Sequence, residues 1–305
     1  MFVITHKKIF FAISAALVML SIAAIAVWGL RFGVDFSGGS SVTVSYDGVT
    51  PETAVVAASL EKAGFEGSVV RESGEQGINI RTKTLSEGDR TKLLEALATE
   101  GSGTPAIERL SSVGPSVGQE LRRKTVWAII LVLLMIIMYL AFTFRKVSEP
   151  VSSWIYGLVA IATLAHDVII PAGVVAVLGR FAGLEADTLF VVALLTILGV
   201  SVNDTIVVFD RIRENLHLKE ERHTKETFAQ TVGESLQQTY VRSFNTSFTI
   251  VLVLLVLFFL GGPTIHSFIL TLLVGQIAGT YSSIFLASPL LVVIGERKLN
   301  KVPAK

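Results

Sequence analysis

The chain has 305 residues, of which 51% are hydrophobic and only 17% are charged, well below the roughly 25% charged residues of soluble domains. Its formal net charge of +1 argues against a basic nucleic-acid-binding protein. The absence of cysteine excludes disulfides, thiolate metal sites and a cysteine nucleophile. So much apolar sequence needs lipid around it, and we therefore expect an integral membrane protein.

Six apolar runs are long enough to cross a bilayer, since a spanning helix needs about 20 residues for ~30 Å of hydrocarbon. We expect them at residues 9–30, 125–144, 151–178, 188–209, 240–260 and 265–294. The fifth run is strongly apolar only over residues 248–260, so it must extend inward to Tyr240. The first run leaves a cleaved signal peptide as an alternative, but it exceeds the core of about 7 to 15 residues typical of such peptides.

Basic residues gather at one set of span ends, and the opposite short loops hold almost none. By the positive-inside rule that side is the cytoplasm. We expect residues 1–30 to form a cytoplasmic N-terminus and the first span, residues 125–294 the other five spans, and residues 295–305 a basic cytoplasmic tail. The basic residues are Lys7, Lys8, Arg145, Lys146, Arg211, Arg213, Lys219, Arg222, Lys225, Arg297, Lys298, Lys301 and Lys305.

Residues 31–124 carry the pattern of a small folded domain outside the membrane. Strands are predicted at 41–46, 68–72, 77–82 and 105–113, with a turn at Ser73, Gly74 and Glu75. One helix begins at Pro51 and a second is N-capped by Ser86. The order β-α-β-β-α-β predicts an α+β ferredoxin-like domain. The first helix is expected to carry its apolar residues Val55, Leu60 and Ala63 on one face, and the second contains Leu93, Leu94 and Leu97.

Asp204 and Arg242 are ionisable residues within predicted spans, where a charge costs roughly 2.5 to 3.5 kcal/mol on insertion scales. Counting ~1.5 Å per residue from the outer helix ends places Asp204 roughly 24 Å deep and Arg242 roughly 28 Å deep, which predicts an ion pair. The distance between Asp204 and Arg242 would then control the protonation of Asp204. In the alternative, Arg242 reaches the headgroups and Asp204 only packs. Asn203 and Asn245 are neighbouring polar residues.

His166 and Asp167 lie near the middle of the third predicted span, without a basic partner on the same helix. They are either functional or a polar contact that fixes helix packing, and both interpretations stay open. The segment 211–238 mixes both charge signs and has apolar residues at four-residue intervals. This pattern predicts an amphipathic helix on the cytoplasmic membrane surface. The histidines show no metal-ligand spacing and no phosphate-binding loop occurs, so neither a metal site nor nucleotide hydrolysis is expected.

Four motifs resemble the SecF family, the smaller subunits of the bacterial SecDF protein-export complex, which is related to the RND transporter superfamily. They cover residues 33–39 (GVDFSGG), 165–167 (AHD), 199–214 (GVSVNDTIVVFDRIRE) and 242–247 (RSFNTS). The resemblance covers nearly the whole chain, and it includes the six spans and the single outer domain.

The resemblance implies a bacterial inner-membrane protein that, with SecD, uses the proton motive force to promote protein export through SecYEG after the ATP-driven SecA step. The proton is then the coupling ion, and no cofactor is expected. YajC, YidC, the exported polypeptide and membrane lipid are further implied partners, whereas nucleic acid is not. By the same resemblance, Asp204 would carry the proton with Arg242 as its charge partner, and Asn203 and Asn245 would line the route. Asp167 and His166 are further supporting polar residues, to which the resemblance assigns no role. The implied periplasmic motif is Gly33, Asp35, Phe36, Gly38 and Gly39.

Two other functions remain open from the sequence. One alternative is an RND-type half-transporter for lipids or drugs, and the other is a scaffold subunit without a proton role. An enzyme is not expected, because the sequence offers no nucleophile and base pair and no metal cluster. No catalytic residue is therefore predicted.

Overall fold

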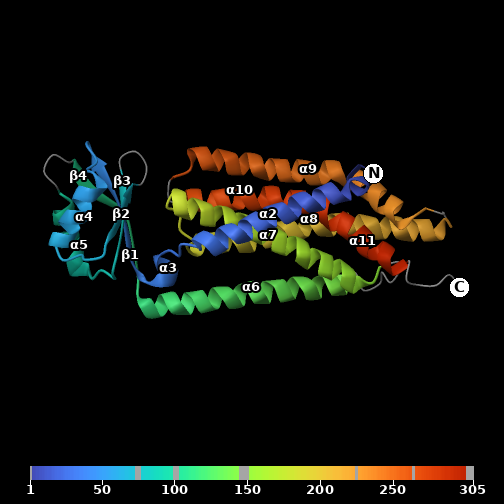
Figure 1. Cartoon of the computed structure of the whole chain (residues 1–305), viewed down its shortest axis with the longest axis horizontal. Helices are drawn as coiled ribbons and strands as arrows, with labels where there is room; N and C mark the ends of the chain where they lie inside the picture. Colours follow the sequence, from blue (N-terminus) through green and yellow to red (C-terminus); the bar gives the residue numbers. More distant parts are fainter. Residues whose placement is uncertain are drawn as a thin grey trace.

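The computed structural model describes residues 2–72, 77–98, 103–143, 151–223, 226–262 and 265–299. Long helices form a bundle, and a small sheet domain lies at one end, here called the domain end; the opposite end is the far end (Figure 1). Some residues used in the predictions lie outside the described ones: Ser73, Gly74, Glu75, Phe144, Arg145, Lys146, Lys225, Lys301 and Lys305.

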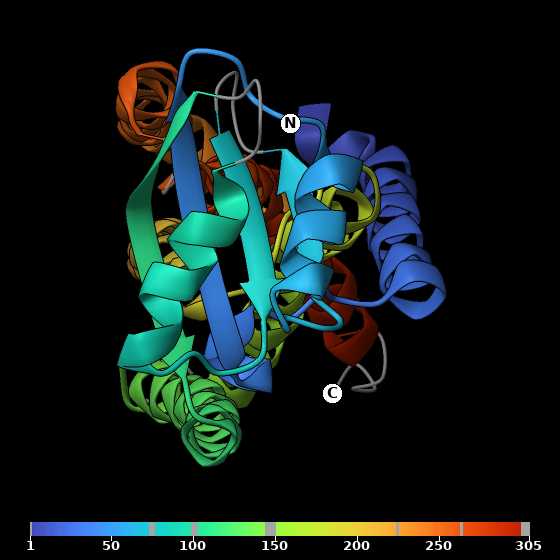
Figure 2. The ribbon, with the colours of Figure 1, turned by 90° about the vertical axis from the view of Figure 1, so that its left-hand side faces the viewer.

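The sheet domain has the predicted order of elements. β1 (Gly39–Asp47), β2 (Val69–Glu72), β3 (Gly77–Thr82) and β4 (Thr104–Val113) form an antiparallel sheet in the order β2-β3-β1-β4. α4 (Thr53–Lys62) and α5 (Glu87–Leu97) cover the sheet face that points away from the bundle (Figure 2). Val42 lies opposite Ile80 on one side and Leu110 on the other. This arrangement confirms the α+β domain expected from the sequence.

The core of the sheet domain lies between the sheet and the two helices. Its fully buried side chains each contribute roughly 1.5–3 kcal/mol. They are Val42, Val44, Tyr46, Val56, Leu60, Ile78, Ile80, Leu93 and Leu97. On α4 the prediction was partly wrong, because Val56 replaces Val55 in the core and Ala63 is exposed. Val56 and Leu60 are four residues apart and share one helix face, whereas Val55 points to the side.

Six helical segments of the described chain are long and apolar enough to cross a membrane, which confirms the six predicted spans. Short helices α1 (Phe2–Thr5) and α3 (Val34–Ser37) flank the first of them. The spans are α2 (Lys7–Trp28), α6 (Pro115–Thr143), α7 (Ser153–Phe181), α8 (Thr188–Glu221), α9 (Phe228–Leu260) and a sixth made of α10 (His266–Ser282), the π-helical segment η2 (Ser283–Ala287) and α11 (Ser288–Leu299). α6 begins ten residues before the predicted start at Thr125.

Three of the spans form the centre of the bundle. In their most apolar stretches, 61% of α7, 56% of α8 and 56% of the sixth span are buried, against 17% of α2, 6% of α6 and 17% of α9. Small residues bring the central helices together: a Cβ on Gly275 would lie 2.1 Å from Ile197 Cδ1, and one on Gly279 would lie 3.1 Å from Ser201 Cβ. The outer helices leave apolar faces for lipid or a partner.

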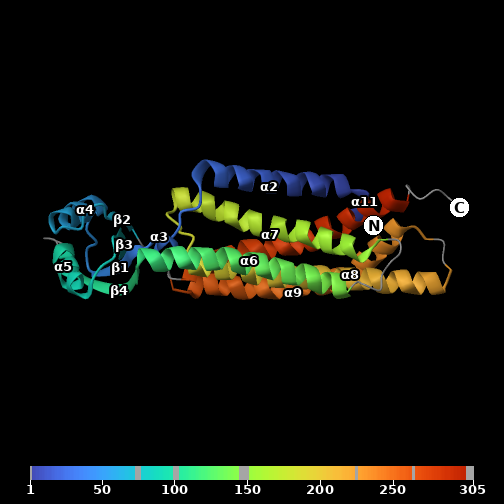
Figure 3. The ribbon, with the colours of Figure 1, turned by 90° about the horizontal axis from the view of Figure 1, so that it is seen from below.

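Segment 211–238 does not form the predicted surface helix. Instead α8 continues to Glu221 and α9 begins at Phe228, so the two helices project as an antiparallel hairpin at the far end (Figure 3). At ~1.5 Å per residue, the 34 residues of α8 span about 51 Å, more than the ~30 Å hydrocarbon core. The apolar residues Phe228, Val232 and Leu236 are buried against the bundle and not on lipid.

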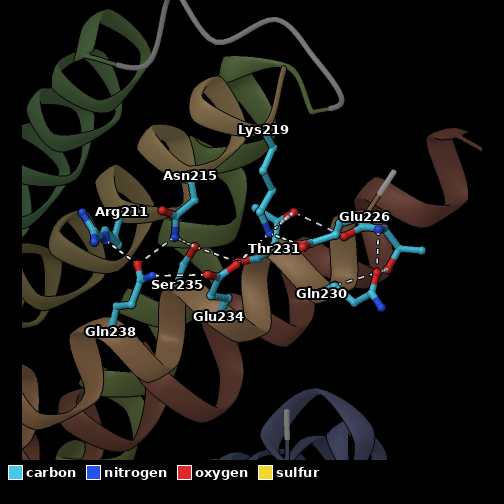
Figure 4. Close-up of polar contacts among 10 residues, drawn as sticks. Arg211, Asn215, Lys219, Glu226, Gln230, Thr231, Glu234, Ser235 and Gln238 are labelled. Atoms are coloured by element: carbon cyan, nitrogen blue, oxygen red, sulfur yellow. Dashed lines mark hydrogen bonds and ion pairs between the residues drawn. The ribbon is translucent and has the colours of Figure 1, made fainter. Parts of the chain in front are cut away.

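Polar side chains hold the two arms of this hairpin together (Figure 4). The side-chain amide of Asn215 donates to Ser235 Oγ at 2.8 Å and to Gln238 Oε1 at 2.9 Å. Lys219 lies between two carboxylates, with Nζ 2.7 Å from Glu234 Oε2 and in contact with Glu226. Lys219 therefore pairs with carboxylates across the hairpin, whereas Arg211 and Arg213 form ion pairs with Glu214 and Asp210 on α8 itself.

Candidate functional site

Asp204 lies inside the bundle on the inward face of α8. That face repeats at helical spacing through Ile197, Ser201, Asp204 and Val208, all of which are buried. The Asp204 side chain accepts a hydrogen bond from Ser247 Oγ of α9 at 3.2 Å. Within the described residues this hydroxyl is its one hydrogen-bond partner and no cation contacts it. A charged carboxylate buried without a cation is costly in an apolar bundle.

Arg242 and Asn245 point away from Asp204. The buried face of α9 runs through Thr239, Ser243 and Ser247, whereas Arg242 and Asn245 are exposed. Five residues separate Arg242 from Ser247, which is roughly 140° around the helix and ~7.5 Å along it. No ion pair joins Arg242 to Asp204 in the described part of the chain, so the predicted contact is not formed here. Asn203 is also exposed, next to Asp204 on α8.

His166 and Asp167 form a second buried polar centre, on α7. Asp167 is fully buried and His166 is 3% exposed. His166 Nδ1 lies 2.8 Å from Asp167 Oδ1. On the other carboxylate oxygen, Ser201 of α8 donates a short hydrogen bond and Ser282 of α10 donates at 2.8 Å. The three central helices therefore meet at Asp167, which is more enclosed than Asp204.

Hydroxyl groups continue this polar region along the centre of the bundle. Thr205 Oγ1 of α8 lies 3.0 Å from Ser283 Oγ, the first residue of η2. The π-helical turn at η2 breaks the regular helix directly after Ser282, and such turns are frequent at functional sites. Ser243 Oγ and Ser288 Oγ are buried without a hydrogen-bond partner among the described residues.

The predicted motif at residues 33–39 forms the joint between the sheet domain and the bundle. Gly38 and Gly39 have φ values of +75° and +113°, which favour glycine. A Cβ on Gly38 would lie 2.8 Å from the Cα of Pro115, and one on Gly39 would lie 2.7 Å from the Thr82 carbonyl oxygen. Phe36 is buried. The motif is therefore a tight structural connection between α2, β1 and the start of α6.

The same motif contacts the loop between α7 and α8. Asp35 Oδ2 accepts a hydrogen bond from the Thr188 amide, the first residue of α8, at 3.0 Å. The amide of Gly33 donates to the Ala186 carbonyl at 3.0 Å, and the amide of Ala186 donates to the Arg31 carbonyl at 2.7 Å. The start of α8 is thus fastened to the first residues of the outer region.

Arginines of the sheet reach the same loop, and sequence reasoning did not identify them. Arg71 Nη1 donates to the Gly183 carbonyl at 3.2 Å. Arg81 Nη1 donates to the Phe32 carbonyl at 3.0 Å and pairs with Glu185 Oε1 at 3.4 Å, while Nη2 contacts Ser37. We call the contacts of Arg71 and Arg81 the arginine clasp. Because these residues lie about a hundred positions from the loop, no local pattern indicated the contact.

Two carboxyls beside the clasp are affected by burial. Burial raises the pKa of Glu185, and the nearby guanidinium of Arg81 offsets only part of the effect. Burial also raises the pKa of Asp187, which caps α8 by accepting from the Phe190 amide at 2.9 Å. The joint thus contains carboxyls that respond to pH.

Buried ionisable groups inside a bundle of six spanning segments define a multi-pass membrane protein of the transport type. Two families match the chain: "Protein export membrane protein SecD/SecF, C-terminal" over residues 94–297, and "SecD/SecF GG Motif" over residues 23–48. The chain belongs to the SecF family of protein translocase subunits.

Relatives match over most of their length. Protein translocase subunit SecF of Thermobaculum terrenum is 41% identical over 301 residues, with 95% of this chain and 92% of the relative covered. SecF of Haemophilus influenzae is 36% identical, with 98% and 87% covered. These names describe transport subunits, in agreement with the prediction that the chain is not an enzyme.

The SecDF protein of Thermus thermophilus is 36% identical over 96% of this chain, which spans 38% of that relative. A crystal structure of SecDF from Thermus has a TM-score of 0.83 at 33% identity, with 96% of this chain and 38% of the solved chain covered. SecDF in a "Super-membrane-facing form" gives a TM-score of 0.67 at 34% identity, with 97% and 39% covered. In the SecDF protein of Thermus thermophilus, a SecD part and a SecF part are thus joined in one chain.

Proposed function

We propose that this chain acts with SecD in Sec-dependent protein export, and that it couples proton movement across the membrane to that work through Asp204. The supporting observation is the position of Asp204, which is 6% exposed and contacted by the neutral hydroxyl of Ser247. Protonation removes the charge that this hydroxyl stabilises, so the packing of α8 on α9 responds to the proton. A proton crossing supplies roughly 2.3 kcal/mol per 100 mV of potential.

The joint at the domain end provides a way to pass a shift of α8 to the outer domain. α8 carries Asp204 in its middle and is tied at its first residue to Asp35. The arginine clasp holds the preceding loop against β2 and β3. In the proposed mechanism, a small displacement of α8 moves the sheet domain, which lies in the periplasm, where secreted chains emerge.

We propose that SecD packs against the exposed face of α8 and α9 that carries polar side chains. Asn203, Arg242 and Asn245 are exposed in spanning helices, where contact with lipid is costly. A partner half that supplies a carboxylate would satisfy Arg242. The fused SecDF relative supports this pairing. We further propose SecYEG, YajC and YidC as neighbours in a bacterial inner membrane, with residues 31–124 periplasmic and both termini cytoplasmic.

The test replaces Asp204 with asparagine, which keeps its size and removes its charge. Export of a secreted reporter driven by a proton gradient should fall to the level seen without the gradient, while the complex with SecD still assembles. The matched control is Asp210→Asn on the same helix, where the side chain is 61% exposed, and export should stay normal. Unchanged export in Asp204→Asn would contradict proton coupling and favour a scaffold. A lipid or drug half-transporter would co-purify without Sec subunits.

A further inference from the structure

We propose that His166 and Asp167 form a second proton-binding site in the bundle, distinct from Asp204. The proposal rests on the proton-coupled function above and assigns a further binding site to it. The pair lies on α7, whereas Asp204 lies on α8, and the hydroxyl of Ser201 contacts Asp167 from α8.

The buried pair of His166 and Asp167 is electrically neutral only when it holds one added proton. With a neutral imidazole, an ionised Asp167 would leave one negative charge in a fully buried position, and no lysine or arginine contacts it in the described structure. An uncompensated charge inside an apolar bundle is costly. Uptake of one proton makes the pair neutral, either as imidazolium and carboxylate or as imidazole and carboxylic acid.

The hydrogen bonds around Asp167 suit both forms. In the charged form, the Ser282 hydroxyl donates to Oδ2 at 2.8 Å. If Oδ2 carries the proton, it donates to Ser282 Oγ, whose hydrogen then turns to the Gly279 carbonyl at 3.1 Å. A hydroxyl that can reverse its direction in this way keeps every group paired. The site can therefore gain or lose a proton without leaving Asp167 unsatisfied.

His166 supplies an additional position for the proton. Its Nε2 is buried and has no hydrogen-bond partner in the described part of the chain. Nδ1 already faces Asp167 Oδ1, so Nε2 is the imidazole atom left to exchange a proton as the helices move. An imidazole fixed only for packing would be expected to have both nitrogens satisfied.

Few other titratable groups face the pair. The ring of Tyr281, on α10, stacks on His166 with centroids 6.1 Å apart. From α8 the nearest is Asp204, three residues after Ser201 on the same buried face. Residues 9–28 of α2 and residues 283–287 of η2 contain no charged side chain.

Infrared difference spectroscopy of the full chain with SecD in lipid vesicles tests the proposal, with acid and alkaline buffers as the two states. Protonated carboxyls and imidazole give separate bands. Asp204→Asn should lose one buried-carboxyl component and retain the second together with the imidazole bands. His166→Gln, which leaves Asp167 and its serines in place, should shift the pH midpoint of the retained component. Asp210→Asn should change neither.

Two results would overturn the proposal. One is the loss of all buried-carboxyl and imidazole signals in Asp204→Asn; the other is an unchanged pH midpoint in His166→Gln. His166→Gln keeps the buried Asp167 carboxylate and its hydrogen bonds to Ser201 and Ser282, so the test does not depend on a variant that changes Asp167 itself. The export assay of Asp204→Asn is separate: normal export there contradicts proton coupling, while the infrared result still decides whether the pair binds a proton.

Discussion

Replacement of Arg81 by glutamine should loosen the joint between the sheet domain and the bundle. The guanidinium makes charged hydrogen bonds to the Phe32 carbonyl and to Ser37, and it pairs with Glu185 at 3.4 Å. Hydrogen bonds to charged groups contribute about 1.5–3 kcal/mol each, and a partly exposed ion pair contributes about 0.2–1 kcal/mol.

Solvent lowers these values, because the two side chains of the ion pair are 30% and 28% exposed. A loss of about 2–4 kcal/mol in the stability of the closed joint follows, since glutamine cannot make all three contacts. At about 1.4 kcal/mol per factor of ten, opening should increase roughly 30- to 700-fold.

Hydrogen exchange followed by mass spectrometry measures this opening directly. The amides of Gly33, Ala186 and Thr188 are bonded across the joint, so peptides containing them should exchange faster in Arg81→Gln. Arg90→Gln is the matched control, because Arg90 is an exposed residue of α5 in the same domain. Equal exchange in the two variants would refute the clasp as the element that holds the joint.

Two further predictions concern the pH response and the helix packing. Because burial raises the pKa of Glu185 in the folded protein, ionisation of Glu185 costs the joint stability that the pairing with Arg81 offsets only in part. The joint is therefore most stable below the ordinary glutamate pKa and loses stability as pH rises through the raised value. Glu185→Gln should remove this pH dependence from the protection of the joint amides, measured relative to the intrinsic exchange rate at each pH, and protection that keeps the parent's pH dependence would contradict this. Gly173→Ala on α7 would place a Cβ 2.4 Å from Ser21 Cβ on α2, and it should lower the free energy of unfolding in detergent by about 1–3 kcal/mol. Gly157→Ala on the same helix is the control: its Cβ meets nothing within 4 Å, so the variant should be neutral or stabilising. Equal losses of stability in the two variants would argue against the close contact of α7 with α2.

The sequence by itself determined the elements of this protein. A run of about 20 apolar residues has one stable form in lipid, a helix that closes its own hydrogen bonds, so six spans follow from composition. Alternating apolar residues likewise predicted β1 and β3, the strands that contribute Val42 and Ile80 to the core of the sheet domain. It also identified Asp204, because a carboxylate in an apolar run is visible without any structure.

Only the tertiary structure decided which side chains meet. The rotation of each helix about its axis depends on its neighbours. Counting residues therefore placed Arg242 near the depth of Asp204, but it could not show that Arg242 lies on the exposed face of α9, whereas Ser247 on the buried face contacts Asp204. Asp167 acquired its partners in the same way, from serines on two other helices. Arg81 meets Glu185 across 104 positions of sequence. Such contacts are set by the packing of the whole bundle, because local patterns fix the faces of an element but not the elements that those faces touch.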